Sequence, residues 1–240
     1  MLFSKRGAAG KPSPLTTNGL LMPPDFPVKA YESVHAAVVV TRGSDPQYDH
    51  YGGAWNAVAY RFLGAADSGD AFIASVKAHG TTPQPPERYL QERALFEFFS
   101  AGFSVFEASF YGLYAFGAFL APLEFKLATP RDQQRVTPSR VKEAYERAFQ
   151  GDPIISVFDA LFSDPGYQWW RELRNILTHR AAPGRRIYVS LGQDDAPPVE
   201  WKLNNLPFNE SLVTKGREEL ARLLETLLEA TLEFLKRRLK

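Results

Sequence analysis

The chain has 240 residues, 45% hydrophobic and 13% aromatic, and this composition excludes disorder of the whole chain because it can bury a sizeable core. Its 28 basic and 27 acidic residues give a net charge of +1, so no long-range field draws it to nucleic acid or to an anionic membrane. The lack of cysteine excludes disulfides and thiolate chemistry and suits a reducing cytoplasm. Lys5 and Arg6 are not followed by the apolar core of a signal peptide. We therefore expect an unsecreted, cytoplasmic protein.

The start of the chain is rich in residues that oppose regular structure. Residues 1–28 contain eight glycines and prolines, which predicts an irregular N-terminal arm. From Val28 the pattern becomes apolar, and the segment Ala36–Val40 is compatible with either a helix or a strand.

Two helices are predicted next, over residues 47–66 and 68–79, with Gly52 and Gly53 weakening the first. A loop of threonine, proline and glutamine then separates this section from the rest of the chain. From these patterns we predict three parts of the chain: an arm over 1–28, a helical extension over 29–86 and a helical bundle over 87–240.

A long helix is predicted from residue 87 to about residue 120, with a break favoured near Gly112 or Gly117. Its least polar part, Ala108–Leu123, has sixteen residues without a charge. That is shorter than the roughly 20 residues that cross a bilayer, and Glu107 interrupts the apolar run before it. We expect a buried central helix rather than a membrane anchor.

Three shorter helices are predicted to begin at a proline that follows a capping residue. The side-chain oxygen of the Thr or Asp accepts a hydrogen bond from a free N–H, and the proline supplies a preset φ without wasting a donor. The three starts are Thr137-Pro138, Asp152-Pro153 and Asp164-Pro165. The helices extend to about Gln150, Phe162 and His179, and Pro183-Gly184 stops the last of them.

The C-terminal part is predicted to contain a β-hairpin and a final helix. Short alternating runs at 186–191 and 199–203 indicate the hairpin, 186–203. Leucines form one stripe over about 210–239, which predicts a long amphipathic packing helix. Its basic end, 236–240, is suited either to the helix dipole or to binding phosphate.

One stretch carries polar residues suited to chemistry. Arg174 supplies a permanent cation, Asn175 an amide and His179 an imidazole. Imidazoles are side-chain groups that can gain or lose a proton near neutral pH. On a helix, Asn175 and His179 lie about 40° apart around the axis, whereas Arg174 and His179 diverge by about 140°. One helix therefore presents the Arg/His pair awkwardly. A second copy across a two-fold axis would assemble both pairs into one cleft.

This tyrosine- and tryptophan-rich helix with its Arg-Asn-x-x-x-His ending, set in a helical bundle, resembles the HEPN (higher eukaryotes and prokaryotes nucleotide-binding) superfamily. The sequence LRNILTHR at Leu173–Arg180 is close to that family's R-x4-6-H pattern. The resemblance covers about 87–240 and implies a four- or five-helix bundle that dimerises by pairing the motif helices. Active members are metal-independent RNases found as toxins and in antiviral defence, and inactive members bind nucleotides or proteins.

The resemblance also implies roles for single residues. His179 would transfer protons, Arg174 would hold the scissile phosphate, and Asn175 would orient the phosphate or the partner motif while the ribose 2′-hydroxyl attacks. Glu107 would pair with Arg174 or act as an acid, and Arg180 is a further auxiliary candidate. We expect a homodimer without metal or cofactor, with RNA, a nucleotide or an antitoxin protein as partner and no membrane. The alternative is a non-catalytic binding module.

Overall fold

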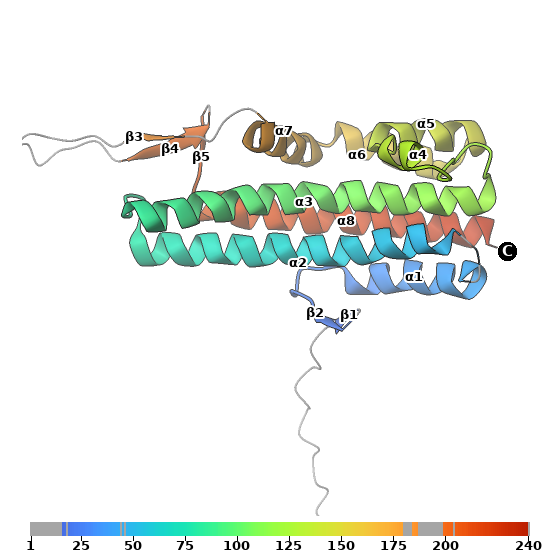
Figure 1. Ribbon diagram of the computed structural model, residues 1–240, viewed down its shortest axis with the longest axis horizontal. Coiled ribbons are helices and arrows are strands. Elements are labelled where there is room, and N and C mark those ends of the chain that lie inside the picture. Colours follow the sequence, from blue (N-terminus) through green and yellow to red (C-terminus); the bar gives the residue numbers. More distant parts are fainter. Residues whose placement is uncertain are drawn as a thin grey trace, which may run out of the picture.

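The computed structural model of the protein describes residues 16–17, 19–43, 45, 47–179, 184–186, 199–203 and 205–239. Over these residues the chain is mainly helical and carries short antiparallel strands, which confirms the predicted fold class. The longest helices are α1 (Val28–Arg42), α2 (Tyr48–His79), α3 (Pro85–Leu120) and α8 (Glu210–Arg238). In Figure 1, α2, α3 and α8 run side by side; α1 lies on one side of them and the shorter helices lie on the other.

Two expected helix breaks are wrong. Residues 47–79 were predicted as two helices, but α2 is continuous because it packs along α3 over its whole length, and this packing outweighs the low helix propensity of Gly52 and Gly53. The expected break in α3 is also absent. Gly117 instead makes room for Phe125, since a Cβ there would lie 2.5 Å from the phenylalanine ring. The segment Ala36–Val40, compatible with either structure, is helical within α1.

The shorter helices are α4 (Pro130–Gln134), α5 (Pro138–Ala148), α6 (Pro153–Ser163) and α7 (Pro165–His179). All three predicted proline starts are confirmed. Thr137 accepts a hydrogen bond from the Arg140 N–H at 3.4 Å, and Asp152 accepts one from the Ile154 N–H at 3.1 Å. Because each cap and the N–H that it accepts lie within four residues, the start of each helix can be predicted from the local sequence.

The strands form two small antiparallel units. In the arm, β1 (Thr16–Thr17) pairs with β2 (Leu20–Leu21). Near the C-terminal part, β3 (Arg185–Arg186) pairs with β4 (Glu200–Leu203), which in turn pairs with β5 (Leu206–Pro207). The β3–β4 pairing agrees with the predicted hairpin, although most of its first strand and all of its turn lie outside the described residues. The strand β5 was not predicted.

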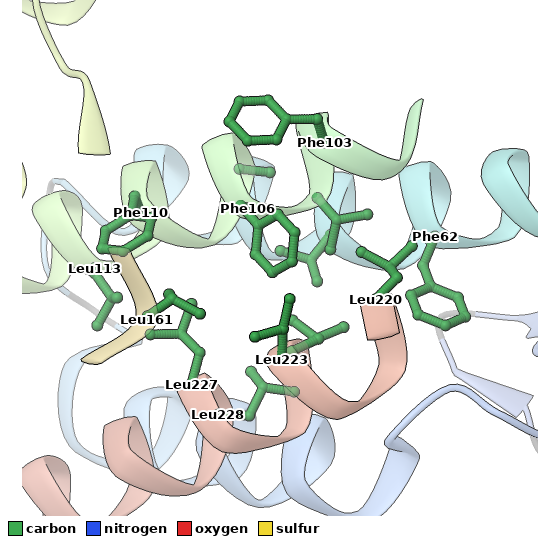
Figure 2. Packing of buried hydrophobic residues seen from close by; sticks show 14 of the residues in the cluster. Phe62, Phe103, Phe106, Phe110, Leu113, Leu161, Leu220, Leu223, Leu227 and Leu228 are labelled. Carbon is green, nitrogen blue, oxygen red and sulfur yellow. The ribbon is translucent and has the colours of Figure 1, made fainter. Parts of the chain in front are cut away.

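The core extends through the whole bundle, and one part of it lies between α3 and α8. Figure 2 shows phenylalanines of α3 packed against leucines of α8, with Phe62 of α2 and Leu161 of α6 beside them. The α3 rings Phe106 and Phe110 have no exposed surface. Of the helices that the structure describes, α3 alone is long and apolar enough to cross a bilayer, and 72% of its most apolar window is buried in the bundle.

The basic end of α8 is held by ion pairs. Arg237 and Arg238 donate to the two carboxylate oxygens of Asp152 at 2.7 Å and 3.0 Å. Arg238 also lies over the ring of Phe149, 5.1 Å from its centre. Because the Asp152 side chain is only 3% exposed, this contact joins the last turn of α8 to the first turn of α6 through a buried carboxylate.

Candidate functional site

The motif helix α7 is seated on α3 by aromatic rings. Trp170 is fully buried, and its ring centre lies 5.0 Å from that of Phe98 and 5.1 Å from that of Phe99. The indole contacts α3 at Gly102, where a Cβ would lie 2.5 Å from two of its ring carbons. A side chain at this position would therefore have to displace either a rigid buried ring or the whole motif helix.

Replacing Gly102 by alanine is expected to destabilise the protein by about 1–3 kcal/mol, because overpacking against Trp170 outweighs the better helix propensity of alanine. Thermal or denaturant unfolding measures the loss. Gly64→Ala is the matched control: its Cβ would meet only the Ala101 methyl, at 3.9 Å, so that variant should be as stable as the wild type or more so. Equal stability of the two variants would contradict the close seating of Trp170.

Asp164 anchors the start of α7. Its carboxylate accepts the Gly166 N–H at 2.7 Å, and the Arg222 guanidinium of α8 donates to both of its oxygens at 3.1 Å and 2.9 Å. Burial alone would raise the pKa of the Asp164 carboxyl, but the hydrogen bonds from Arg222 and Gly166 outweigh burial and lower that pKa. The motif helix is thus tied to α8 by a contact that requires ionised Asp164.

This lowered pKa predicts how stability depends on pH. The contribution of Asp164 is fully present above the unfolded-state pKa of about 3.9 and is lost as the pH falls through the lower folded-state pKa. Asp164→Asn should therefore be less stable than the wild type at neutral pH, and the difference should shrink at about pH 2.5. Thermal unfolding of both proteins at each pH measures this, and a difference that stays constant with pH would contradict the ion pair.

Arg174 is held inward, toward α3. Its guanidinium forms an ion pair with Glu107, donates to Asn175 Oδ1 at 3.0 Å, and lies 5.0 Å from the centre of the Phe103 ring. Its side chain is 20% exposed and that of Glu107 is 35% exposed. The expected pairing of Glu107 with Arg174 is confirmed. The arginine charge is thus already partly compensated within one chain.

His179 has a different environment at the last residue of α7. It is exposed, and within the described ranges it has no hydrogen-bond or ion-pair partner. No contact joins it to Arg174, as expected for residues that diverge by about 140° on one helix. The chain thus brings Glu107, Arg174 and Asn175 together and leaves His179 apart from them. Arg180 lies outside the described residues.

Further residues near the motif were not predicted. Ser104 Oγ donates to Glu107 Oε2 at 3.1 Å, and the Ser104 carbonyl accepts from Arg61 of α2 at 2.9 Å. Only the spacing of Ser104 and Glu107, one turn apart on the same helix face, is visible in the sequence. Among the described residues, no group of three or more His, Asp or Glu side chains is arranged to hold a metal ion.

No family model, curated protein or solved structure matches this chain. The HEPN resemblance therefore stays a prediction, and what the site can do follows from its own residues. An exposed imidazole can exchange protons with a substrate, and a guanidinium with two donor edges can bind phosphate. These two groups come from one helix but occupy different sides of it.

Proposed function

We propose that this protein is a metal-independent, HEPN-type endoribonuclease that acts as a homodimer. The observation that carries the proposal is the exposure of His179, which has no partner among the described residues and stands one helical turn from Asn175. A histidine that only completed a helix end would be expected to bond to nearby carbonyls or acids.

The proposed reaction uses the 2′-hydroxyl of the RNA as nucleophile. His179 accepts the hydroxyl proton while the 2′-oxygen forms a bond to the adjacent phosphorus. The bond from phosphorus to the 5′-oxygen breaks, and that oxygen takes up a proton from water. The products are a 2′,3′-cyclic phosphate and a 5′-hydroxyl. Arg174 binds the phosphate oxygens and stabilises the charge that develops on them.

A second copy of α7 would supply what one copy lacks. Pairing two motif helices about a two-fold axis would place His179 of one protomer near Arg174 of the other. In that arrangement the phosphate competes with Glu107 for Arg174. The site is therefore proposed as a composite of two chains, in a cytoplasmic toxin or defence protein.

The second candidate function is a non-catalytic module that binds RNA, a nucleotide or a protein such as an antitoxin. The observation that favours it is the partner set of Arg174, because a guanidinium bonded to both Glu107 and Asn175 has less capacity for phosphate. A module of this kind would use α7 for contact alone and would need no free imidazole.

The experiment that separates the two functions is RNA cleavage in the presence of EDTA. The purified protein should cut single-stranded or transfer RNA and leave cyclic phosphate ends, and it should elute as a dimer in size exclusion with light scattering. Cleavage by the wild type no faster than by His179→Ala would rule out the ribonuclease. Absence of RNA cleavage together with binding of RNA, a nucleotide or a protein partner would support the binding module.

A further inference from the structure

A cavity of about 450 Å³ lies between α2, α3 and the start of α5, next to the Glu107 end of the motif site. Its volume falls within the roughly 300–1,000 Å³ of small-molecule sites. Its wall is polar and apolar in nearly equal parts, and four polar side chains stand on it. The lining residues are Gly53, Ala54, Ala57, Arg61, Glu107, Ala108, Phe110, Tyr111, Val136, Thr137 and Pro138.

Two opposite charges face this cavity without pairing with each other. The Arg61 guanidinium donates to the Ser104 carbonyl at 2.9 Å and has no carboxylate partner among the described residues. Glu107 accepts from the Ser104 hydroxyl at 3.1 Å and from Arg174, which leaves further lone pairs on its carboxylate. Because both charged groups bond to the same residue, they stand close together on one side of the cavity.

The rest of the cavity offers an apolar surface. Val136 and Pro138 form the wall that precedes and opens α5. Phe110 has no exposed surface, because its ring packs against Phe158 and Phe162 of α6. Apart from Arg61, the α2 side of the wall is made of glycine and alanine, which leaves room for a ligand next to the helix. A Cβ at Gly53 would meet no atom within 4 Å.

We propose that this cavity binds a zwitterionic α-amino acid with an apolar side chain. The ligand carboxylate binds Arg61, its ammonium group binds Glu107, and its side chain packs against Ala57, Val136 and Pro138. A simple amine would leave Arg61 without a carboxylate. A simple anion would lack the contact with Glu107, whose carboxylate otherwise has Arg174 and Ser104 as its partners. The cavity shares Glu107 with the motif site, but His179 does not line it, so binding of the amino acid does not require RNA cleavage.

Isothermal titration calorimetry with L-phenylalanine and L-leucine tests the proposal on the intact protein. Both should bind, whereas 3-phenylpropionate, which lacks the ammonium group, and phenethylamine, which lacks the carboxylate, should each bind at least about tenfold more weakly. Equal binding of the three phenyl compounds would overturn the charge assignment. No binding of either amino acid at millimolar concentration would overturn the proposal. Tighter binding of a mononucleotide than of either amino acid would overturn it in favour of a nucleotide site.

Variants locate the site. Arg61→Ala should weaken L-phenylalanine binding by about tenfold or more through loss of a charged hydrogen bond. Gly53→Leu should fill the cavity and abolish binding, and its melting temperature should not fall because the position is open and helical. Arg93→Ala, on α3 outside the cavity, should bind like the wild type. Unchanged binding by Gly53→Leu would overturn the location, and retained binding by His179→Ala would separate this site from the ribonuclease.

Discussion

Replacement of His179 by alanine should lower the rate of RNA cleavage by about 10²- to 10⁴-fold, the usual contribution of a positioned proton-transfer group. The fold should not change, because the side chain is exposed and has no partner among the described residues. Cleavage of a labelled RNA in EDTA measures the rate. His79→Ala is the matched control, since His79 is also an exposed histidine at the last residue of a helix. Equal losses in both variants would contradict a specific role for His179.

A subunit-mixing experiment tests the composite site directly. Arg174→Ala and His179→Ala should each be inactive alone, but mixed dimers should regain one working site if Arg174 and His179 act across the two-fold axis. If both groups of a site came from one protomer, no mixed dimer would contain an intact pair, and activity would not return. The result therefore depends on the arrangement of the site and not only on the presence of its residues.

Asp152→Ala is expected to lower the free energy of unfolding by about 3 kcal/mol or more, the largest effect on stability that we predict. The change removes the N-cap of α6 and leaves Arg237 and Arg238 without their buried partner. Burial alone would raise the pKa of Asp152, but the hydrogen bonds from Arg237, Ile154 and Arg238 lower it, so the carboxylate is ionised at neutral pH. Denaturant unfolding at neutral pH measures the loss.

Two controls separate the parts of this contact. Asp152→Asn keeps a capping oxygen and loses the charge, so its loss of stability should lie between those of the wild type and Asp152→Ala. Asp159→Ala removes a carboxylate that pairs with Lys142 but is 58% exposed, and it should cost less than about 1 kcal/mol. If the Asp159 and Asp152 variants lost the same stability, the buried double ion pair would contribute no more to the free energy of unfolding than an exposed ion pair does.

The sequence predicted features that depend on a few neighbouring residues. The Thr-Pro and Asp-Pro starts of α5, α6 and α7 are confirmed, because a cap and its N–H lie within one turn. The leucine stripe of α8 and the buried character of α3 are visible as periodicity. In the site, Glu107 was predicted to pair with Arg174 because a carboxylate within an apolar helix needs a partner, and the two residues form an ion pair.

Features set by distant contacts could not be predicted. The continuity of α2 through Gly52 and Gly53 depends on its packing against α3, which no local propensity encodes. The partners of Arg237 and Arg238 lie 85 residues or more away along the chain. The cavity beside Glu107 is formed by three helices, and Arg61 showed no pattern in the sequence that would connect it with Ser104.

The position of α8 in the bundle has a consequence for synthesis on the ribosome. This helix contacts α1, α2, α3, α6 and α7, all of which precede it in the sequence. The hairpin of α2 and α3 can form early, because its helices are neighbours in sequence. The phenylalanines of α3 that Figure 2 shows against α8 then stay exposed to solvent until residues 210–238 have left the ribosome. During that interval the nascent chain exposes aromatic surface, and intermediates with such a surface are prone to aggregate.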